Sequence, residues 1–240
     1  MACEQGRFTG KPVAAATDPT CCSGSRATIR DGTCGERFLP GSEFFPMNHT
    51  AEQSRMRQHG IRARRELGDL QRLAYSLRIA DRLERQAAFR SATTIAVYLS
   101  SWDEVDTSEI ILRSWRANKR VVAPVIEKNS RMSFLLLEAD TQLRSNRYGL
   151  LEPASTRKVC MREINLVITP LTAFDRSASR VGMGGGYFDR RFAHLLLRHA
   201  YAQPRMIGVA FDEQRVTKIP ENPWDISLYA CITENRTYSF

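Results

Sequence analysis

The stretch most suited to chemistry is a glycine-rich segment at residues 180–190, which reads RVGMGGGYFDR. Glycine adopts positive φ without steric cost, so a run of glycines can turn successive backbone N–H groups toward one point. The helix expected after the run adds the positive end of its dipole. The segment therefore predicts a phosphate-binding loop made by Gly182, Gly184, Gly185 and Gly186.

Three charged side chains border these glycines and suit the same ligand. Arg180 and Arg190 carry forked guanidinium groups that match phosphate oxygens. Asp189 offers a hard oxygen ligand where Mg²⁺ could bridge two phosphates. The alternative is a plain tight turn before a helix. The loop is neither a P-loop, because no Gly-Lys-Ser/Thr follows, nor a dinucleotide fingerprint, because twelve residues separate the expected strand from the glycines.

A second polar segment, LSSWDEVDT at residues 99–107, follows the first expected strand. Ligands of open α/β sheets bind beyond the carboxyl ends of the strands. Glu104 is able to accept hydrogen bonds from the N–H groups of a heterocycle, and Trp102 offers a flat wall. Asp106 and Thr107 suit the N-cap of the next helix better than a ligand. The residues alone leave Glu104 open between a binding and a structural role.

These segments need a scaffold, and the hydrophobic pattern predicts one of alternating helices and strands from residue 51 onward. In one expected helix, five apolar residues recur at helical spacing and are expected to face the core: Leu70, Leu73, Leu77, Ala80 and Leu83. Continuous apolar strands separated by helices predict an α/β fold, with a mostly parallel sheet covered on both faces. Helices are expected at 51–66, 69–88, 107–117 and 187–199, and strands at 94–99, 121–124, 133–137, 166–169, 206–211 and 229–233.

The charge balance favours an anionic partner. Lys and Arg number 35 against 26 Asp and Glu, a net charge of +9, and residues 55–90 hold ten arginines against four acids. No apolar run is long enough to span a bilayer and no secretory leader is evident, so a soluble cytoplasmic protein is expected. The six cysteines lack metal-ligand spacing and are interpreted as unpaired thiols.

Residues 1–46 differ in composition from the rest of the chain. They hold six of the 14 glycines, four of the ten prolines and four of the six cysteines, without helical or strand periodicity. Thr50 then suits a helix N-cap, with Gln53 at the capping-box position. The pattern predicts a disordered extension or a mis-assigned start at 1–46, with Met47 or Met56 as the true start, and one domain at 47–240.

Six blocks in fixed order resemble the 5-formyltetrahydrofolate cyclo-ligase family, also called 5,10-methenyltetrahydrofolate synthetases. The resemblance covers residues 53–234 and departs from the usual pattern at Gln53, where a basic residue is common, and at Ala178, where a turn glycine is usual. The blocks are LSSWDEVDT at 99–107, NKRVVAP at 118–124, NRYGLLEP at 146–153, TPLTAFD at 169–175, RVGMGGGYFDR at 180–190 and PWDI at 223–226, followed by ITE at 232–234.

The resemblance implies a single-domain, three-layer αβα sandwich and a ligase that forms a C–N bond. The reaction it implies is closure of 5-formyltetrahydrofolate to 5,10-methenyltetrahydrofolate, driven by ATP with Mg²⁺ and releasing ADP and phosphate. The implied partners are the folate and ATP; neither nucleic acid nor a membrane is expected as a partner, and a monomer is expected.

The resemblance also assigns site residues by matching position. It places Arg180 and Tyr187 in catalysis and Asp189 and Asp225 at Mg²⁺. The residues it assigns to the folate are Leu99, Glu104, Tyr148, Met183, Gly184, Gly185, Gly186 and Tyr187. The residues it assigns to ATP are Arg57, Arg180, Val181, Gly182, Met183, Gly184, Gly185, Gly186, Tyr187 and Phe188.

Two other functions stay open from the residues alone. A sugar-phosphate isomerase or acyl-CoA transferase of similar layered architecture would use the glycine loop to bind a phosphate without hydrolysing ATP. A basic nucleic-acid-binding module would use residues 55–90, and its retention on nucleic acid would depend on salt.

Overall fold

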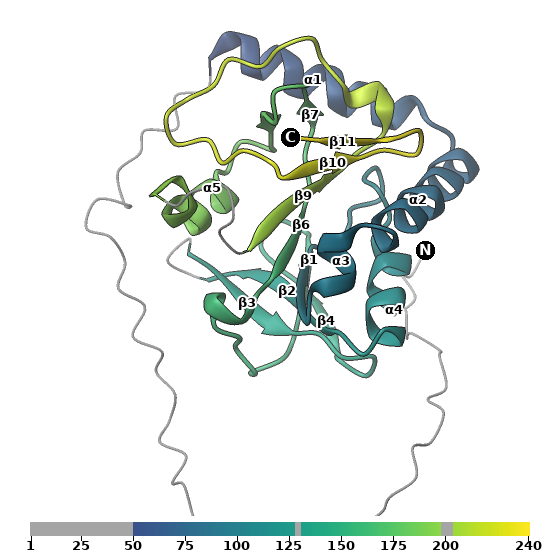
Figure 1. Cartoon of the computed structure of the whole chain (residues 1–240), viewed down its shortest axis with the longest axis vertical. Helices are drawn as coiled ribbons and strands as arrows, with labels where there is room; N and C mark the ends of the chain where they lie inside the picture. The colour runs from purple at the N-terminus through teal and green to yellow at the C-terminus, as the bar shows by residue number, and fades with distance from the viewer. Residues whose placement is uncertain (1–49, 128–130, 198–203) are drawn as a thin grey trace, which may run out of the picture.

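The computed structural model describes residues 50–127, 131–197 and 204–240, so the extension predicted at 1–46 lies outside the described residues. A seven-stranded sheet forms the centre, in the order β11-β10-β9-β6-β1-β2-β3 (Figure 1). Its strands are β1 (Thr94–Val97), β2 (Arg120–Ile126), β3 (Met132–Leu136), β6 (Leu166–Thr169), β9 (Arg205–Val209), β10 (Ala230–Ile232) and β11 (Thr237–Ser239).

The inner strands β2, β1, β6, β9 and β10 are parallel, and β3 and β11 pair antiparallel at the two edges. Helical segments cover both faces, which confirms the α/β fold with a mostly parallel sheet. Side chains of the inner strands are buried on both faces, as such a sheet requires. The helices are α1 (Ala51–Glu66), α2 (Asp69–Glu84), α3 (Ala87–Ser91), α4 (Ser108–Arg116) and α5 (Tyr187–Phe192).

Two hydrophobic clusters lie on opposite faces of the sheet. On one face, Ile79 and Leu83 of α2 and Ile110 of α4 pack with Ile95 of β1. On the other face, Phe192 at the end of α5 packs with side chains of β3, β6 and β9. Adjacent residues of a strand point to opposite faces, so each inner strand contributes to both clusters. Among the described residues, no helix is long and apolar enough to cross a membrane.

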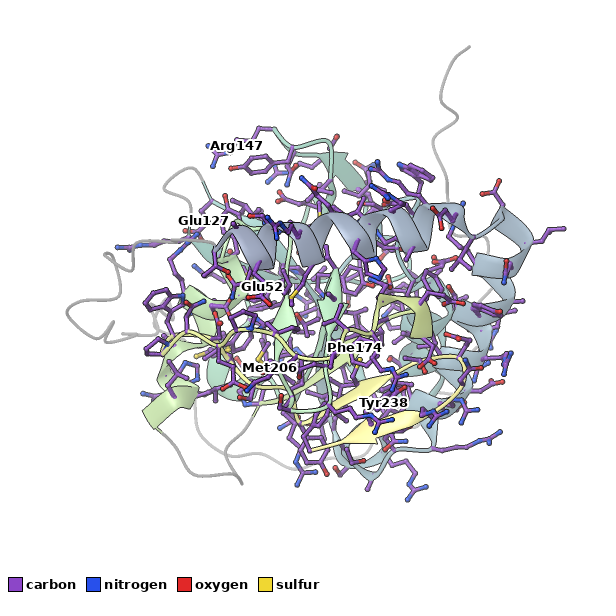
Figure 2. All side chains as sticks on the ribbon, turned by 90° about the horizontal axis from the view of Figure 1, so that it is seen from above. Glu52, Glu127, Arg147, Phe174, Met206 and Tyr238 are labelled. Atoms are coloured by element: carbon purple, nitrogen blue, oxygen red, sulfur yellow. The ribbon has the colours of Figure 1, made fainter. Side chains whose placement is uncertain are left out.

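Helix α1 lies outside these layers and crosses one end of the molecule, next to β7 (Figure 1). Thr50 caps it by accepting the N–H of Gln53 at 3.0 Å, as expected, whereas the Gln53 side chain donates to the carbonyl of Pro220 at 2.9 Å. In the view from above, Arg147 and Tyr238 lie on opposite sides of α1 (Figure 2). The helix therefore passes over the strand ends, where ligands of α/β sheets bind.

The expectation that the apolar residues of α2 face the core is wrong for the first half of the helix. Leu70, Leu73 and Leu77 are 84%, 49% and 40% exposed, whereas Leu83 is 1% exposed. At about 100° per residue, Leu70 and Leu83 point about 140° apart around the helix axis and cannot share one face. The helix buries a different stripe, made of Arg72, Ser76, Ile79, Ala80 and Leu83.

Element boundaries differ from expectation in several places. The helix expected at 69–88 is divided into α2 and α3, and the helix expected at 187–199 ends at Phe192 and continues as a 3-10 turn, Ala193–Leu197. Two short hairpins and the edge strand β11 were not predicted, because segments of two or three residues carry too little periodicity. The hairpins are β4 (Leu143–Ser145) with β5 (Leu151–Pro153), and β7 (Ala173–Phe174) with β8 (Arg180–Val181).

Candidate functional site

The glycine loop joins the β7–β8 hairpin to α5. Gly184 has φ +98° and Gly186, the N-cap of α5, has φ +56°, which confirms positive φ at two of the four glycines; Gly182 and Gly185 do not have positive φ. A Cβ on Gly185 would lie 2.7 Å from the ring of Tyr187. The loop therefore needs glycine at 184 and 186 for its backbone and at 185 for space.

The hairpin before the loop is held by a buried carboxylate. Asp175 accepts the N–H of Ser179 at 3.1 Å on Oδ1 and that of Ile219 at 2.8 Å on Oδ2. Ala178, one of the two positions at which the sequence departs from the resemblance, adopts φ +72°. The departure at Ala178 thus leaves the left-handed turn in place, at the steric cost that a Cβ brings there.

Helix α1 contacts the glycine loop directly. The Nε of Arg57 donates to the carbonyl of Gly182 at 2.8 Å, and burial lowers the pKa of this arginine. Gly60 lets α1 approach the chain before the loop, because a Cβ there would fall 1.7 Å from the carbonyl oxygen of Thr172. Arg57, which the resemblance assigns to ATP, therefore lies beside the loop.

The two arginines that border the loop have partners within the chain. Arg180 is 8% exposed and donates to the carbonyl of Ile226 at 2.8 Å and to Oδ1 of Asp189 at 2.9 Å. Arg190 donates to the carbonyl of Gly185 at 2.7 Å and lies over the ring of Tyr187. Both guanidinium groups thus shape the loop and α5 in addition to any contact with a ligand.

The two acids assigned to Mg²⁺ are close enough to affect each other. Burial raises the pKa of Asp225, and the nearby charge of Asp189 raises it further. Within the described residues no group of three or more His, Cys, Asp or Glu is placed to hold a metal. Two carboxylates fit Mg²⁺ that is held mainly by phosphate oxygens and water, because this ion usually binds proteins through one or two carboxylates.

The β4–β5 hairpin brings Tyr148 to the glycine loop. The hydroxyl oxygens of Tyr148 and Tyr187 lie 2.8 Å apart, and the guanidinium of Arg147 lies 4.8 Å from the centre of the Tyr148 ring. The hydrogen bond with Tyr187 lowers the pKa of Tyr148, and burial raises the pKa of Tyr187. A residue assigned to the folate therefore meets one assigned to both substrates.

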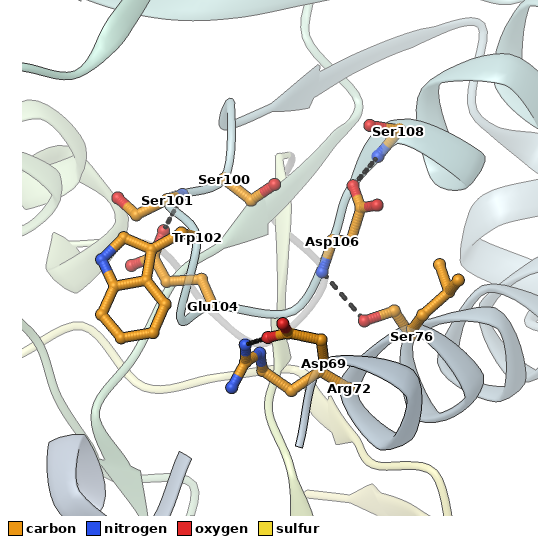
Figure 3. Close-up of a pocket in the computed structure, with 10 residues that line it drawn as sticks. Asp69, Arg72, Ser76, Ser100, Ser101, Trp102, Glu104, Asp106 and Ser108 are labelled. Atoms are coloured by element: carbon orange, nitrogen blue, oxygen red, sulfur yellow. Dashed lines mark hydrogen bonds and ion pairs between the residues drawn. The ribbon is translucent and has the colours of Figure 1, made fainter. Parts of the chain in front are cut away.

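Glu104 lines a cavity of about 360 Å³ between α2 and the segment 99–107 (Figure 3). Its Oε2 accepts the N–H of Ser101 at 2.9 Å. Trp102 is 69% exposed, with the guanidinium groups of Arg65 and Arg72 each 5.5 Å from its ring centre. Trp102 is thus a wall of the cavity, as expected for a flat side chain in this segment.

Thr107 is the N-cap residue of α4 by position, as expected, but its side chain makes no capping bond, and Asp106 lies one residue before the cap. Asp106 accepts the N–H of Ser108 at 2.9 Å, whereas the Thr107 hydroxyl donates to the carbonyl of Tyr98 at 2.8 Å.

The remaining assigned residues surround the same region with differing exposure. Leu99 packs partly buried against the core, and Val181 is buried in β8. Phe188 stacks on Phe192, with ring centres 6.2 Å apart. Met183 is 61% exposed at the tip of the loop.

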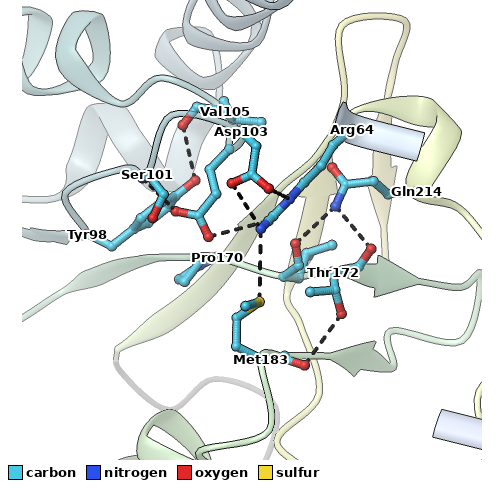
Figure 4. A network of polar contacts seen from close by, with 12 residues as sticks. Arg64, Tyr98, Ser101, Asp103, Val105, Pro170, Thr172, Met183 and Gln214 are labelled. Carbon is cyan, nitrogen blue, oxygen red and sulfur yellow. Dashed lines mark hydrogen bonds and ion pairs between the residues drawn. The ribbon is translucent and has the colours of Figure 1, made fainter. Parts of the chain in front are cut away.

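Sequence reasoning missed Arg64, which connects the two polar segments. It bonds to Asp103 and Glu104 and approaches the sulfur of Met183 (Figure 4). Ten arginines in residues 55–90 conceal that two of them, Arg64 and Arg72, are buried. The available signal is spacing, because Gln53, Gly60 and Arg64 form the buried stripe of α1.

Known proteins similar to this chain agree on one family. The family model described as the 5-formyltetrahydrofolate cyclo-ligase family matches residues 49–234. The 5-formyltetrahydrofolate cyclo-ligase of Escherichia coli K12 is 39% identical over 153 residues, which cover 62% of this chain and 82% of that protein. The enzyme of the same name from Haemophilus influenzae is 33% identical, with 58% and 75% covered.

Solved structures support the fold. The NMR structure of Aquifex aeolicus 5,10-methenyltetrahydrofolate synthetase matches with a TM-score of 0.67 at 24% identity, covering 78% of this chain and 92% of that one. The Mycoplasma pneumoniae synthetase matches with a TM-score of 0.60 at 20% identity, covering 76% and 99%. The family model spans most of the chain and includes the glycine loop, Glu104 and Tyr148. The chain therefore belongs to the 5-formyltetrahydrofolate cyclo-ligase family of ligases.

Proposed function

We propose that this protein closes 5-formyltetrahydrofolate to 5,10-methenyltetrahydrofolate at the expense of ATP, with Mg²⁺. The observation that supports this most is the meeting of two binding segments that are far apart in sequence. The glycine loop suits phosphates, and the Glu104 segment suits a heterocycle with N–H donors. Arg64 contacts both, at Met183 and at Glu104.

The chemistry explains why a phosphate site and a heterocycle site belong together. An N-formyl amide is a poor electrophile, so its oxygen must become a leaving group before N10 can attack the formyl carbon. Transfer of the γ-phosphoryl group of ATP to that oxygen releases ADP and activates the carbon. Attack by N10, loss of the N10 proton to solvent and departure of the oxygen as phosphate then form the methenyl bridge, and no protein nucleophile is required.

The proposed roles of the residues at the phosphate side follow from their positions. The backbone N–H groups of the loop at 182–186 hold the phosphates of ATP, and Arg57 and Arg180 add positive charge beside them. Asp189 and Asp225 would hold Mg²⁺, which neutralises phosphate charge when bound. Asp189 accepts two hydrogen bonds, from the Arg180 guanidinium and from the N–H of Ile226, and both are made to Oδ1.

The folate side is proposed to consist of Leu99, Glu104 and Tyr148, with Met183 and Tyr187 at the boundary with ATP. Glu104 orients the pterin by accepting its N–H groups, and Tyr148 offers an aromatic surface. Tyr187 is proposed to stand between the two substrates, which the contact of its hydroxyl with that of Tyr148 supports. Catalysis then depends mainly on positioning and charge neutralisation.

Turnover by the full chain tests the proposal. The protein is incubated with ATP, Mg²⁺ and 5-formyltetrahydrofolate, and methenyl absorbance in the near ultraviolet is followed together with ADP. We expect the methenyl product and ADP in equal amounts, and we expect neither product when ATP or the folate is left out. Methenyl formation that does not need ATP, or ATP hydrolysis that does not need the folate, would contradict it.

A further inference from the structure

The last turn of α1 contains an arginine that is buried among groups proposed to bind the substrates. Arg64 is 3% exposed, although a guanidinium group stays charged in proteins and is costly to bury. The free-energy cost of burying this charge is offset only when several well-placed partners surround the guanidinium group. Figure 4 shows these partners converging on it from separate segments.

Asp103 is the anchor of this arginine. Nε of Arg64 lies 3.2 Å from Oδ2 of Asp103, and Nη2 lies 3.3 Å from Oδ1, so the pair is bidentate. Asp103 also accepts the Nε of Arg65 at 2.9 Å, and its side chain is 4% exposed. Two arginines thus compensate this one carboxylate, which fixes Arg64 without help from a substrate.

The remaining contacts of Arg64 lead to the two proposed binding segments. Nη1 lies 3.4 Å from Oε1 of Glu104, and Nη2 lies 3.9 Å from the sulfur of Met183. Ser101 donates its N–H to the other oxygen of Glu104. Each carboxylate oxygen has two acceptor positions, so Glu104 is oriented by the protein and keeps capacity for N–H donors of a ligand.

We propose that Arg64 is a positioning residue for the cyclisation. It orients the Glu104 carboxylate toward the pterin and sets the distance between Glu104 and the glycine loop at Met183. This inference rests on the proposed function. Lysine would keep the charge at this position, but its single ammonium group cannot reproduce a bidentate contact and two further contacts in one plane.

The contacts to Glu104 and Met183 add position more than stability. The bidentate bond to Asp103 already connects α1 to the segment 99–107. Met183 is 61% exposed, so its contact with Arg64 buries little apolar surface. A substitution at Arg64 should therefore affect the folate step more strongly than its effect on stability implies.

The test compares Arg64→Lys with Arg65→Lys in the full chain. Arg65 is a matched control, because it also binds Asp103 while its side chain is 55% exposed. For Arg64→Lys we expect the KM for 5-formyltetrahydrofolate to rise about tenfold or more, with a lower kcat and an ATP KM within about twofold of wild type. Arg65→Lys should leave both KM values within about twofold of wild type.

A double-mutant cycle tests whether Arg64 acts through Glu104. In the Glu104→Gln background, Arg64→Lys should raise the folate KM by much less than it does alone, because the group it orients has been changed. Full additivity of the two changes would overturn the inference. The inference would also be overturned if Arg64→Lys kept its folate KM and its lower activity came only from a smaller fraction of folded enzyme, measured by active-site titration.

A replacement variant covers the case in which Arg64→Lys does not fold. Asp103→Asn then loosens the anchor and keeps Arg64 itself, and the same folate-selective rise in KM is expected, whereas an unchanged folate KM overturns the inference. If the wild-type chain makes no methenyl product, the proposed function fails. If the wild type turns over and Arg64→Lys behaves like Arg65→Lys, only the role of Arg64 fails.

Discussion

Neighbouring carboxylates in this site differ in what surrounds them. Asp103 is 3% exposed and is fully engaged by Arg64 and Arg65, whereas Glu104 lies at a cavity and has one bond from the protein on each oxygen. Charge compensation makes Asp103 structural, and spare acceptor capacity makes Glu104 suited to a ligand. The letters DE at 103–104 do not reveal this difference, which follows only from the position of α1.

Glu104→Gln is expected to raise the folate KM or to lower kcat, with little effect on ATP binding. The amide keeps the size of the side chain and replaces one acceptor oxygen by a donor, which costs about 1–3 kcal/mol if that oxygen is desolvated in the complex. Steady-state kinetics with each substrate varied in turn measure the effect. Weaker ATP binding with an unchanged folate KM would mean that Glu104 contacts ATP and not the folate.

Asp225→Asn separates stability from metal use. Burial and the charge of Asp189 raise the pKa of Asp225, so the folded chain binds a proton there at higher pH than the unfolded chain. The stability from this group is therefore present at acid pH and is lost as pH rises through the raised pKa. We expect Asp225→Asn to melt slightly higher than wild type at neutral pH, with a difference that shrinks toward acid pH.

The same variant should need more Mg²⁺ for half-maximal turnover, because it loses one of two hard anionic ligands. Melting curves across pH and a magnesium titration provide the two measurements, with Asp189→Asn as the companion variant. A magnesium titration that neither substitution changes would remove these acids from the metal site.

At the scale of elements, predictability followed length and periodicity. The first helix was predicted at 51–66 and is found at Ala51–Glu66, and the strand at 166–169 is found as Leu166–Thr169. The hairpins around the site escaped prediction, because their strands have two or three residues. Their order depends on tertiary contacts such as those of buried Asp175, which no local pattern contains.

The α2 correction leads to a stability test. Leu83→Ala removes a side chain that is 1% exposed and should cost about 2–5 kcal/mol. Leu70→Ala changes a side chain that is 84% exposed and should stay within about 0.5 kcal/mol of wild type. Urea unfolding of the two variants checks this. Equal losses would restore the sequence-based expectation that both leucines face the core.

Ala178→Gly should stabilise the turn before the glycine loop. At φ +72° a Cβ costs about 1–2 kcal/mol, which glycine would relieve. The greater freedom of the unfolded chain with glycine offsets part of this stabilisation, by about 0.4–1 kcal/mol. The net expectation is a small rise in Tm with unchanged kinetic constants, and Ala173→Gly in the neighbouring strand serves as the control that should lower Tm. A fall in Tm for Ala178→Gly would mean that the turn needs its methyl group.

At the scale of the whole molecule, the sequence placed the binding segments but not their meeting. The glycine loop, the Glu104 segment and Tyr148 come from three separate regions, and contacts through Arg64 and Tyr187 join them. Sequence spacing cannot show that α1 crosses the strand ends and contacts two of these regions. The monomeric state, the cytoplasmic location and the domain boundary at residue 47 stay predictions.

Truncation tests that boundary. A chain that starts at Met47 should melt within a few degrees of the full chain and turn over the folate equally well, because the compositional bias of 1–46 predicts little buried apolar surface. A chain that starts after Arg65 loses the first helix with Arg57 and should bind ATP poorly. A large fall in Tm on removal of residues 1–46 would show that they are part of the packed domain.

The central claim is that the enzyme activates the formyl oxygen as a phosphate leaving group, and the path of that oxygen tests it most directly. 5-Formyltetrahydrofolate labelled with heavy oxygen in its formyl group is converted with unlabelled ATP in unlabelled water, and the inorganic phosphate is analysed by mass spectrometry. The account predicts that the label moves from the formyl group into phosphate, one atom for each methenyl product. Release of the label into water, with unlabelled phosphate, would contradict it.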